Sequence, residues 1–191
     1  MSWRAPVINL RAMKAIGTLA TCVLALGLFA QAPVKEPEFA DTFAALSASG
    51  DLIPLEHETA TIHAGGGGFM IASSKAAYEI SGQKSPVRFH QTPELVFVVR
   101  SVLAQTDTNP ATLYVLRKLD PKKKTREIAF STGHFTPLGG HATTDLNAGQ
   151  IPISFARYGT SSYRIAAANL APGEYALSRA YGQDVYCFGV D

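Results

Sequence analysis

The chain has 191 residues, with 17 Lys or Arg, 15 Asp or Glu and a formal net charge of +2. Three of the basic residues (Arg4, Arg11 and Lys14) and none of the acidic ones precede Ala32, so the rest of the chain carries a net charge of −1. This balance gives no overall attraction for nucleic acid, and we expect no nucleic-acid partner.

The first 32 residues have the pattern of a secretory signal peptide. The basic start is followed by an apolar run from Ala15 to Ala30, and residues 30–32 read Ala-Gln-Ala, a small-x-small cleavage site. We therefore predict cleavage after Ala32 and export of the domain to the periplasm or the extracellular space. The run is short for a membrane span, so we expect no span after cleavage. An uncleaved signal, or a lipidated Cys22, would instead anchor the protein in the membrane.

The remaining chain reads as short strands separated by turns. Residues 33–38 contain two prolines and predict a flexible tether. Residues 39–47 fit a helix by the spacing of Phe39, Phe43 and Leu46, but a turn pattern follows at once, and we favour a strand. Further strands are expected at 52–64, 69–72, 76–80, 86–90, 94–104, 112–119, 125–131, 151–156 and 161–168.

Two stretches stand out within this series. Residues 94–104 form the most apolar run after the signal and predict a central, buried strand. Residues 132–150 lose periodicity and accumulate Gly and Pro, which predicts a long loop, a kind of segment that is often functional.

The segment from Leu170 to Asp191 predicts a sharp corner and a terminal β-hairpin. Pro172 and Gly173 turn the chain, and Tyr175 suits a tyrosine corner, in which the ring packs in the core and the hydroxyl binds backbone. Strands are expected at 174–179 and 185–190. Both faces of the second strand are apolar, so we expect it to be covered on both sides or to lie at an edge between two sheets. Within it lies Cys187, interpreted as a small buried side chain; without Cys22 it has no disulfide partner.

About ten short strands, regular turn signals and no amphipathic helix predict an all-β protein, a single antiparallel β-sandwich spanning residues 39–191. The Leu-Ala-Pro-Gly-Glu-Tyr corner at 170–175 resembles the corner before the last hairpin of immunoglobulin-like sandwiches. Together with Cys-Phe-Gly-Val-Asp at 187–191, it resembles exported bacterial proteins of unassigned function. The resemblance implies an immunoglobulin-like fold and export, and it carries over no catalytic residue.

The strongest local charge feature is a basic group made up of Arg117, Lys118, Lys122, Lys123, Lys124 and Arg126, of which the last four are the candidate ligand-binding residues. It predicts a solvated hairpin tip that protects a sheet edge. The alternative is a binding site for anionic lipid head groups or an anionic envelope polymer.

Metal and catalytic signals are weaker. His134, His141 and Asp145 share the 132–150 segment and offer a chemically possible metal site, but their spacing matches no ligand motif, and we favour solvent-exposed loop histidines. The run Gly65–Gly68 lacks the Gly-Lys-Ser/Thr continuation of a phosphate loop, and we interpret it as a flexible connection. No Gly-x-Ser-x-Gly elbow is present, so we predict no enzyme and no cofactor.

These observations favour a non-enzymatic interaction or structural module of the cell envelope, with an unknown protein or an envelope polymer as partner. The alternatives are a ligand-binding domain for carbohydrate or an anionic polymer, and a hydrolase whose site is assembled from residues distant in the sequence.

Overall fold

The structure is a computed structural model in which residues 34–67 and 72–191 are described. These residues form fifteen strands and one 3-10 turn, η1 (Pro110–Thr112), so the all-β prediction is confirmed. No helix in these two ranges has the length and apolar character needed to cross a membrane. The predicted signal peptide, Cys22 and most of the strand expected at 69–72 lie outside the described residues.

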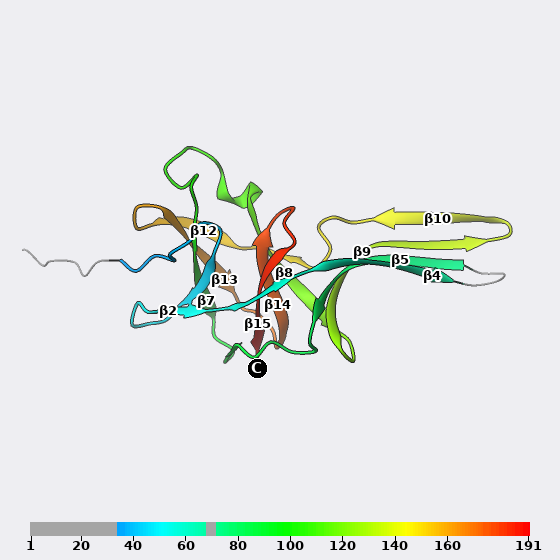
Figure 1. Ribbon diagram of the computed structural model, residues 1–191, viewed down its shortest axis with the longest axis horizontal. Coiled ribbons are helices and arrows are strands. Elements are labelled where there is room, and N and C mark those ends of the chain that lie inside the picture. Colours follow the sequence, from blue (N-terminus) through cyan, green and yellow to red (C-terminus); the bar gives the residue numbers. More distant parts are fainter. Residues whose placement is uncertain (1–33, 68–71) are drawn as a thin grey trace, which may run out of the picture. The chain divides into compact units, whose positions relative to one another are not determined.

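Two sheets build the sandwich (Figure 1). The smaller sheet is antiparallel and has the order β12 (Ser154–Tyr158), β13 (Ser162–Ala168), β7 (Glu94–Arg100), β1 (Phe43–Leu46) and β2 (Leu52–Pro54). Strand β7 lies in its middle, and its residues Phe97, Val98 and Val99 are fully buried, which confirms the prediction of a central buried strand. Strand β1 confirms that part of 39–47 is a strand.

The larger sheet has the order β3 (Glu56–Thr59), β15 (Asp184–Val190), β14 (Gly173–Arg179), β8 (Tyr114–Pro121), β9 (Thr125–Thr136), β5 (Ala72–Ser81) and β4 (Thr61–Gly67). Short strands extend it: β6 (Arg88–Phe89) beside β15, β10 (Gly139–Thr144) beside β9, and β11 (Gln150–Ile151) beside β8. All pairings between described strands are antiparallel except that of β6 with β15.

The larger sheet rolls up on itself, because residues 56–67 belong to both of its ends. The first part of this segment, β3, pairs with β15, and after Ala60 the second part, β4, pairs with β5. Side chains from β5, β8, β9, β14 and β15 fill the inside of the roll as a second hydrophobic core. This core contains Ala60, Ile80, Leu119, Ile128, Ala176, Val185 and Cys187.

Strand β15 is covered on both faces, as its sequence predicts. Phe188 and Val190 point into the core shared with the smaller sheet, whereas Val185 and Cys187 point into the second core. The period-two alternation of a strand places neighbouring residues on opposite faces, so an all-apolar strand is stable only where two cores meet.

The tyrosine corner is present. Tyr175 is almost fully buried, its ring stacks on Phe188 at 5.5 Å between centroids, and its hydroxyl donates a 2.5 Å hydrogen bond to the carbonyl of Ala171. Gly173 adopts a φ of 156°, at the edge of the region that glycine favours. The corner therefore joins β13 to β14 while satisfying a backbone acceptor that the turn leaves unpaired.

Three sequence-based expectations are wrong. The 132–150 segment is mostly strand, because β9 continues to Thr136 and pairs with β10. Residues Gly65–Gly67 are not a loose connection but the end of β4. Residues 34–38 of the predicted tether are held against the domain, since the Glu36 carboxylate accepts hydrogen bonds from residues 160–162 and Pro37 is buried.

Candidate functional site

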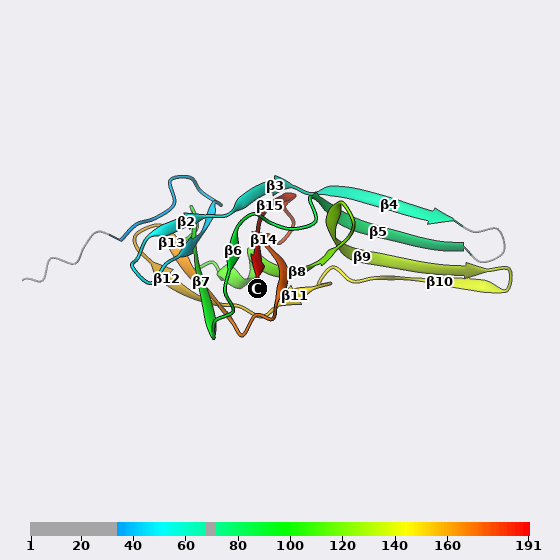
Figure 2. The same cartoon turned by 90° about the horizontal axis from the view of Figure 1, so that it is seen from below.

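Four strand segments continue beyond the rolled sheet and form a surface-exposed arm. We define the arm as residues 61–67 of β4, 72–77 of β5, 131–136 of β9 and all of β10. Figures 1 and 2 show the four segments running side by side away from the sandwich. Every residue of β4 and β10 is exposed, so no core holds these two strands.

The outer edges of the arm carry no pairing partner among the described residues, since β4 pairs only with β5 and β10 only with β9. Neither edge contains Lys, Arg, Asp, Glu or Pro. Natural sheets protect their edges with such residues, because a bare edge offers free N–H and C=O groups to another strand. The edges of the smaller sheet are protected in this way, by Pro54 in β2 and Arg157 in β12.

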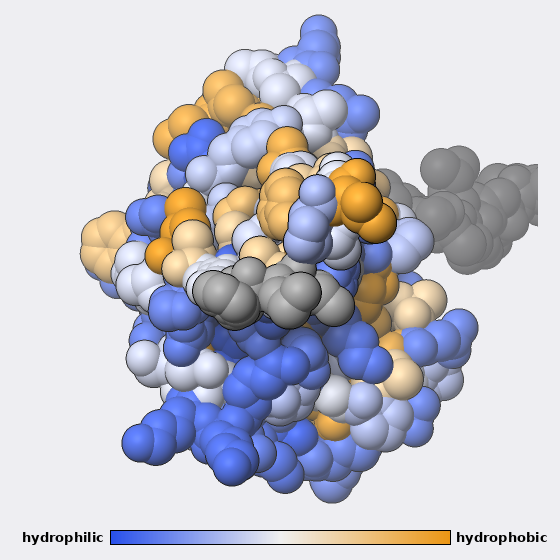
Figure 3. Space-filling model, turned by 90° about the vertical axis from the view of Figure 1, so that its right-hand side faces the viewer, coloured by the Kyte–Doolittle hydropathy of each residue, from blue (hydrophilic) through white to orange (hydrophobic). Residues whose placement is uncertain are grey.

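Exposed apolar side chains accompany these edges. Ile62 in β4 is 55% exposed, Phe135 in β9 is 44% exposed, and Leu138 at the turn between β9 and β10 is 100% exposed. The Phe135 ring covers Gly140 so closely that a Cβ at this glycine would lie 2.3 Å from the ring. In Figure 3, which faces this end of the domain, hydrophobic residues lie mostly in the upper half and hydrophilic ones below.

The structure brings together two of the three predicted metal ligands. His134 and His141 face each other across the β9–β10 ladder, with ring centroids 6.3 Å apart. Asp145 lies beyond the end of β10, where its carboxylate accepts a 2.9 Å hydrogen bond from the Asn147 amide. Within residues 34–67 and 72–191, no group of three His, Cys, Asp or Glu side chains is placed to hold a metal ion. The arrangement thus lacks the third protein ligand of the predicted site.

Of the four residues predicted to form the basic hairpin tip, three lie there. Lys122, Lys123 and Lys124 are exposed between β8 and β9, and Lys122 pairs with Asp120 and, at 3.3 Å, with Glu127. Arg126 does not belong to this surface, because its side chain is 0% exposed. Strand alternation turns Arg126 inward, to the same side as Ile128 in the second core.

Arg126 instead belongs to an ion cluster that links four strands, β3, β6, β9 and β14. Its guanidinium donates to both carboxylate oxygens of Glu56, at 2.8 and 3.1 Å, and lies 3.8 Å from Glu174. Glu174 in turn accepts from Arg88 at 2.7 Å and from the Ser85 amide at 2.8 Å. Burial opposes the charge of Arg126, but its hydrogen bonds to Glu56 and the negative charges of Glu56 and Glu174 together outweigh that cost and raise its pKa.

Nucleophile candidates are poorly placed. The sequence Ser81-Gly82-Gln83-Lys84 has Ser-x-x-Lys spacing, which sequence reasoning missed. It begins at the last residue of β5 and continues into the following bend, rather than lying on a helix that would place Lys beside Ser. Burial raises the pKa of Cys187 to about 12, which keeps it a thiol and a weak nucleophile.

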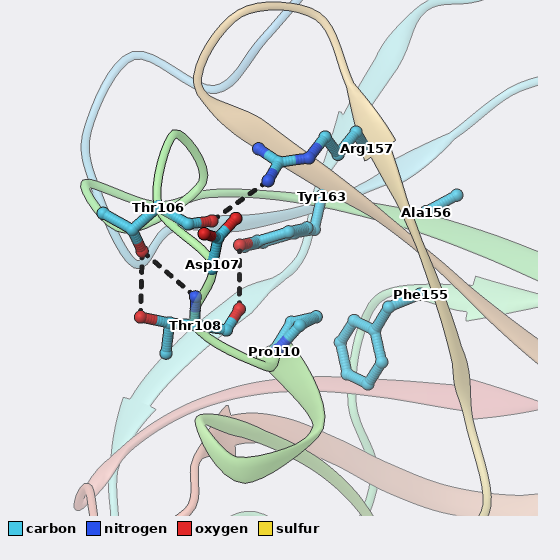
Figure 4. Close-up of a pocket in the computed structure, with 8 residues that line it drawn as sticks. All are labelled: Thr106, Asp107, Thr108, Pro110, Phe155, Ala156, Arg157 and Tyr163. Atoms are coloured by element: carbon cyan, nitrogen blue, oxygen red, sulfur yellow. Dashed lines mark hydrogen bonds between the residues drawn. The ribbon is translucent and has the colours of Figure 1, made fainter.

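A shallow hollow of about 300 Å³ lies between the 101–110 loop and the β12–β13 hairpin (Figure 4). Arg157 and Tyr163 are its main polar side chains, and both donate to loop carbonyls. Arg157 donates to Ala104 and, at 3.0 Å, to Thr106, and the Tyr163 hydroxyl donates to Leu103 at 3.2 Å. These two donors hold the loop, and the other polar residues that line the hollow are Thr106, Asp107 and Thr108. No motif in the sequence points to it.

Compared with known proteins, the chain matches no family model, no curated protein and no solved structure.

Proposed function

We propose that this protein is an exported, non-enzymatic structural module of the cell envelope whose arm joins copies of the same chain by β-strand addition. The observation that carries the proposal is the pair of unprotected edges, one on each side of a single four-stranded sheet. A bare edge is a template for main-chain hydrogen bonds with another strand. Export rests on the signal-peptide pattern of residues 1–32.

The order of strands in the arm favours a second copy as the occupant. All three pairings within β10-β9-β5-β4 are antiparallel, and the number of strands is even, so β4 and β10 run in opposite directions. A second copy in the same orientation can therefore place its β4 antiparallel to the first copy's β10. The two edges also match in length, with seven residues in β4 and six in β10.

The chemistry of the two edges supports the same arrangement. Neither β4 nor β10 contains Lys, Arg, Asp or Glu, so their pairing opposes no permanently charged residues of like sign. The Ala and Gly residues of β4 and β10 are small enough to allow the backbones of two paired edges to approach closely. Because the contact joins two different edges, it does not close on itself, and each added copy leaves a free edge for the next.

The test uses purified residues 33–191 in sedimentation velocity over a range of concentrations. We expect concentration-dependent oligomers for the native sequence. Ala142→Lys in β10 and Ala64→Lys in β4 should each be monomeric alone, because a lysine on the edge blocks strand addition. Mixed together, the two variants should form dimers and nothing larger, since each still has the edge that the other lacks.

Thr132→Lys is the matched control, because it adds the same charge to an exposed position on the inner strand β9. This variant should assemble like the native sequence. A native domain that stays monomeric up to its solubility limit would refute the proposal. Variants that assemble undiminished, with circular dichroism confirming the fold, would refute the assigned edges.

A further inference from the structure

A second feature, independent of the arm, lies on β8 where the rolled sheet opens to solvent. Arg117 follows Leu116, which points into the core shared by the two sheets, so Arg117 points into the roll. Its neighbours in the sheet are Ala176 of β14 and Gln150 of β11. The side chain is half-buried, and burial lowers its pKa.

Arg117 has no ion-pair partner in the part of the chain that the structure describes. Its guanidinium makes one hydrogen bond to protein, to the carbonyl of Leu146 at 3.2 Å. The inward-facing Arg126 on the neighbouring strand, in contrast, is bidentate to Glu56. A cation removed from water without a counter-charge is costly, and such a site favours an anion that can complete it.

The space in front of Arg117 is a cavity of about 80 Å³ whose lining contains no acidic residue. Tyr78, Asn147 and Gln150 contribute a phenol and two amides, which can donate hydrogen bonds to an anion. The remaining lining is Val115, Leu146, Ala180 and Tyr181. One fixed cation surrounded by neutral donors is the composition of an anion site, and the planar fork of arginine matches a carboxylate.

On its inner side the cavity borders the second hydrophobic core. A further space of about 20 Å³ shares Tyr78, Arg117 and Ala180 with it and is otherwise lined mainly by core side chains. These include Ala60, Ile80, Ile128, Ala176 and Val185. A group entering this space must be apolar and no larger than about one or two carbon atoms, since about 10–15 Å³ measured in the same way holds a single water molecule.

We propose that Arg117 binds a carboxylate bearing a small apolar group, with the carboxylate on the guanidinium and the apolar group directed toward the second core. This chemistry occurs in short free monocarboxylic acids and in the C-terminal carboxylate of a peptide that ends in a small residue. The cavity is open to solvent on the side of Tyr181, which is 92% exposed, so a longer chain can leave the site there.

Isothermal titration of residues 33–191 with acetate, with propionate and with N-acetyl-Ala-Ala tests the site. We expect binding of at least one of these acids, and no binding of N-acetyl-Ala-Ala amide, which has the same shape but no charge. If the peptide acid binds at least tenfold more tightly than propionate, the ligand is a peptide terminus; the reverse order identifies a free acid.

Arg117→Gln should weaken binding by at least tenfold. Lys118→Gln should leave it unchanged, because Lys118 is exposed on the opposite face of β8 and its loss changes the net charge equally. Equal affinity of acid and amide in the native domain would overturn the proposal even if Arg117→Gln fails to fold. So would the absence of binding by all three acids, or unchanged affinity in a folded Arg117→Gln variant.

Discussion

Glu36 anchors the start of the domain, and its replacement by Gln is the sharpest stability test that the structure offers. The Glu36 carboxylate accepts five hydrogen bonds, from the backbone amides and hydroxyls of Thr160 and Ser161 and from the hydroxyl of Ser162. Burial by itself would raise the pKa of Glu36, but these donors outweigh it and lower the pKa to about 2.

The size of the effect follows from this shift. The difference between an ordinary pKa of 4.5 and about 2 corresponds to about 3 kcal/mol at about 1.4 kcal/mol per unit. Solvent still reaches the carboxylate and screens it, so we expect Glu36→Gln to lower the free energy of unfolding by about 2 kcal/mol at pH 7. For a domain of this size that corresponds to a fall in Tm of about 4–8 °C.

The pH dependence distinguishes this mechanism from simple loss of packing. Because the pKa of Glu36 is lower in the folded than in the unfolded chain, the stability it contributes is complete above about pH 4.5. It is lost as the pH falls through about 2. Urea unfolding of both proteins between pH 7 and pH 2.5 should therefore show their difference shrinking as the solution becomes more acidic.

Glu38→Gln is the matched control, because Glu38 is exposed and only its backbone carbonyl accepts a hydrogen bond, from Arg100. It should change stability by less than about 0.5 kcal/mol. Equal stability of Glu36→Gln and the native domain at pH 7, or a difference that does not vary with pH, would refute the anchoring role.

Two further substitutions test the interior. Tyr175→Phe removes the hydroxyl that donates to the Ala171 carbonyl and should cost about 1 kcal/mol in thermal or urea unfolding; an unchanged Tm would show that this hydrogen bond does not stabilise the corner. Arg126→Met leaves the carboxylates of Glu56 and Glu174 without their shared cation and should cost about 3–5 kcal/mol by urea unfolding. Lys123→Met, at an exposed position of the nearby tip, should stay within about 0.5 kcal/mol of the native value, and equal losses for the two variants would contradict the buried cluster.

Local sequence patterns predicted only part of the candidate site. The spacing of His134 and His141 gave no reason to place them opposite each other, because the segment was interpreted as a loop. In the structure residues 131–136 of β9 are mostly exposed, all of β10 is exposed, and both are rich in Gly and Thr, so no buried face imposes an alternation of apolar and polar residues there. The only local signal for this hairpin was the Pro-Leu-Gly sequence at 137–139, which forms its turn.

Residues close in sequence were sufficient to predict the all-β class, the tyrosine corner and the two-faced strand β15, because turn chemistry and strand alternation act over a few residues. Tertiary structure alone decided that Arg126 is buried while its basic neighbours are solvated, since its partner Glu56 lies 70 residues away. Tertiary structure also places Glu36 against a loop 124 residues away in the sequence. It places Arg117 beside a cavity whose lining contains no carboxylate. Whether a charge meets an opposite charge, water or an empty space depends on which distant strands become neighbours, and no local spacing encodes that choice.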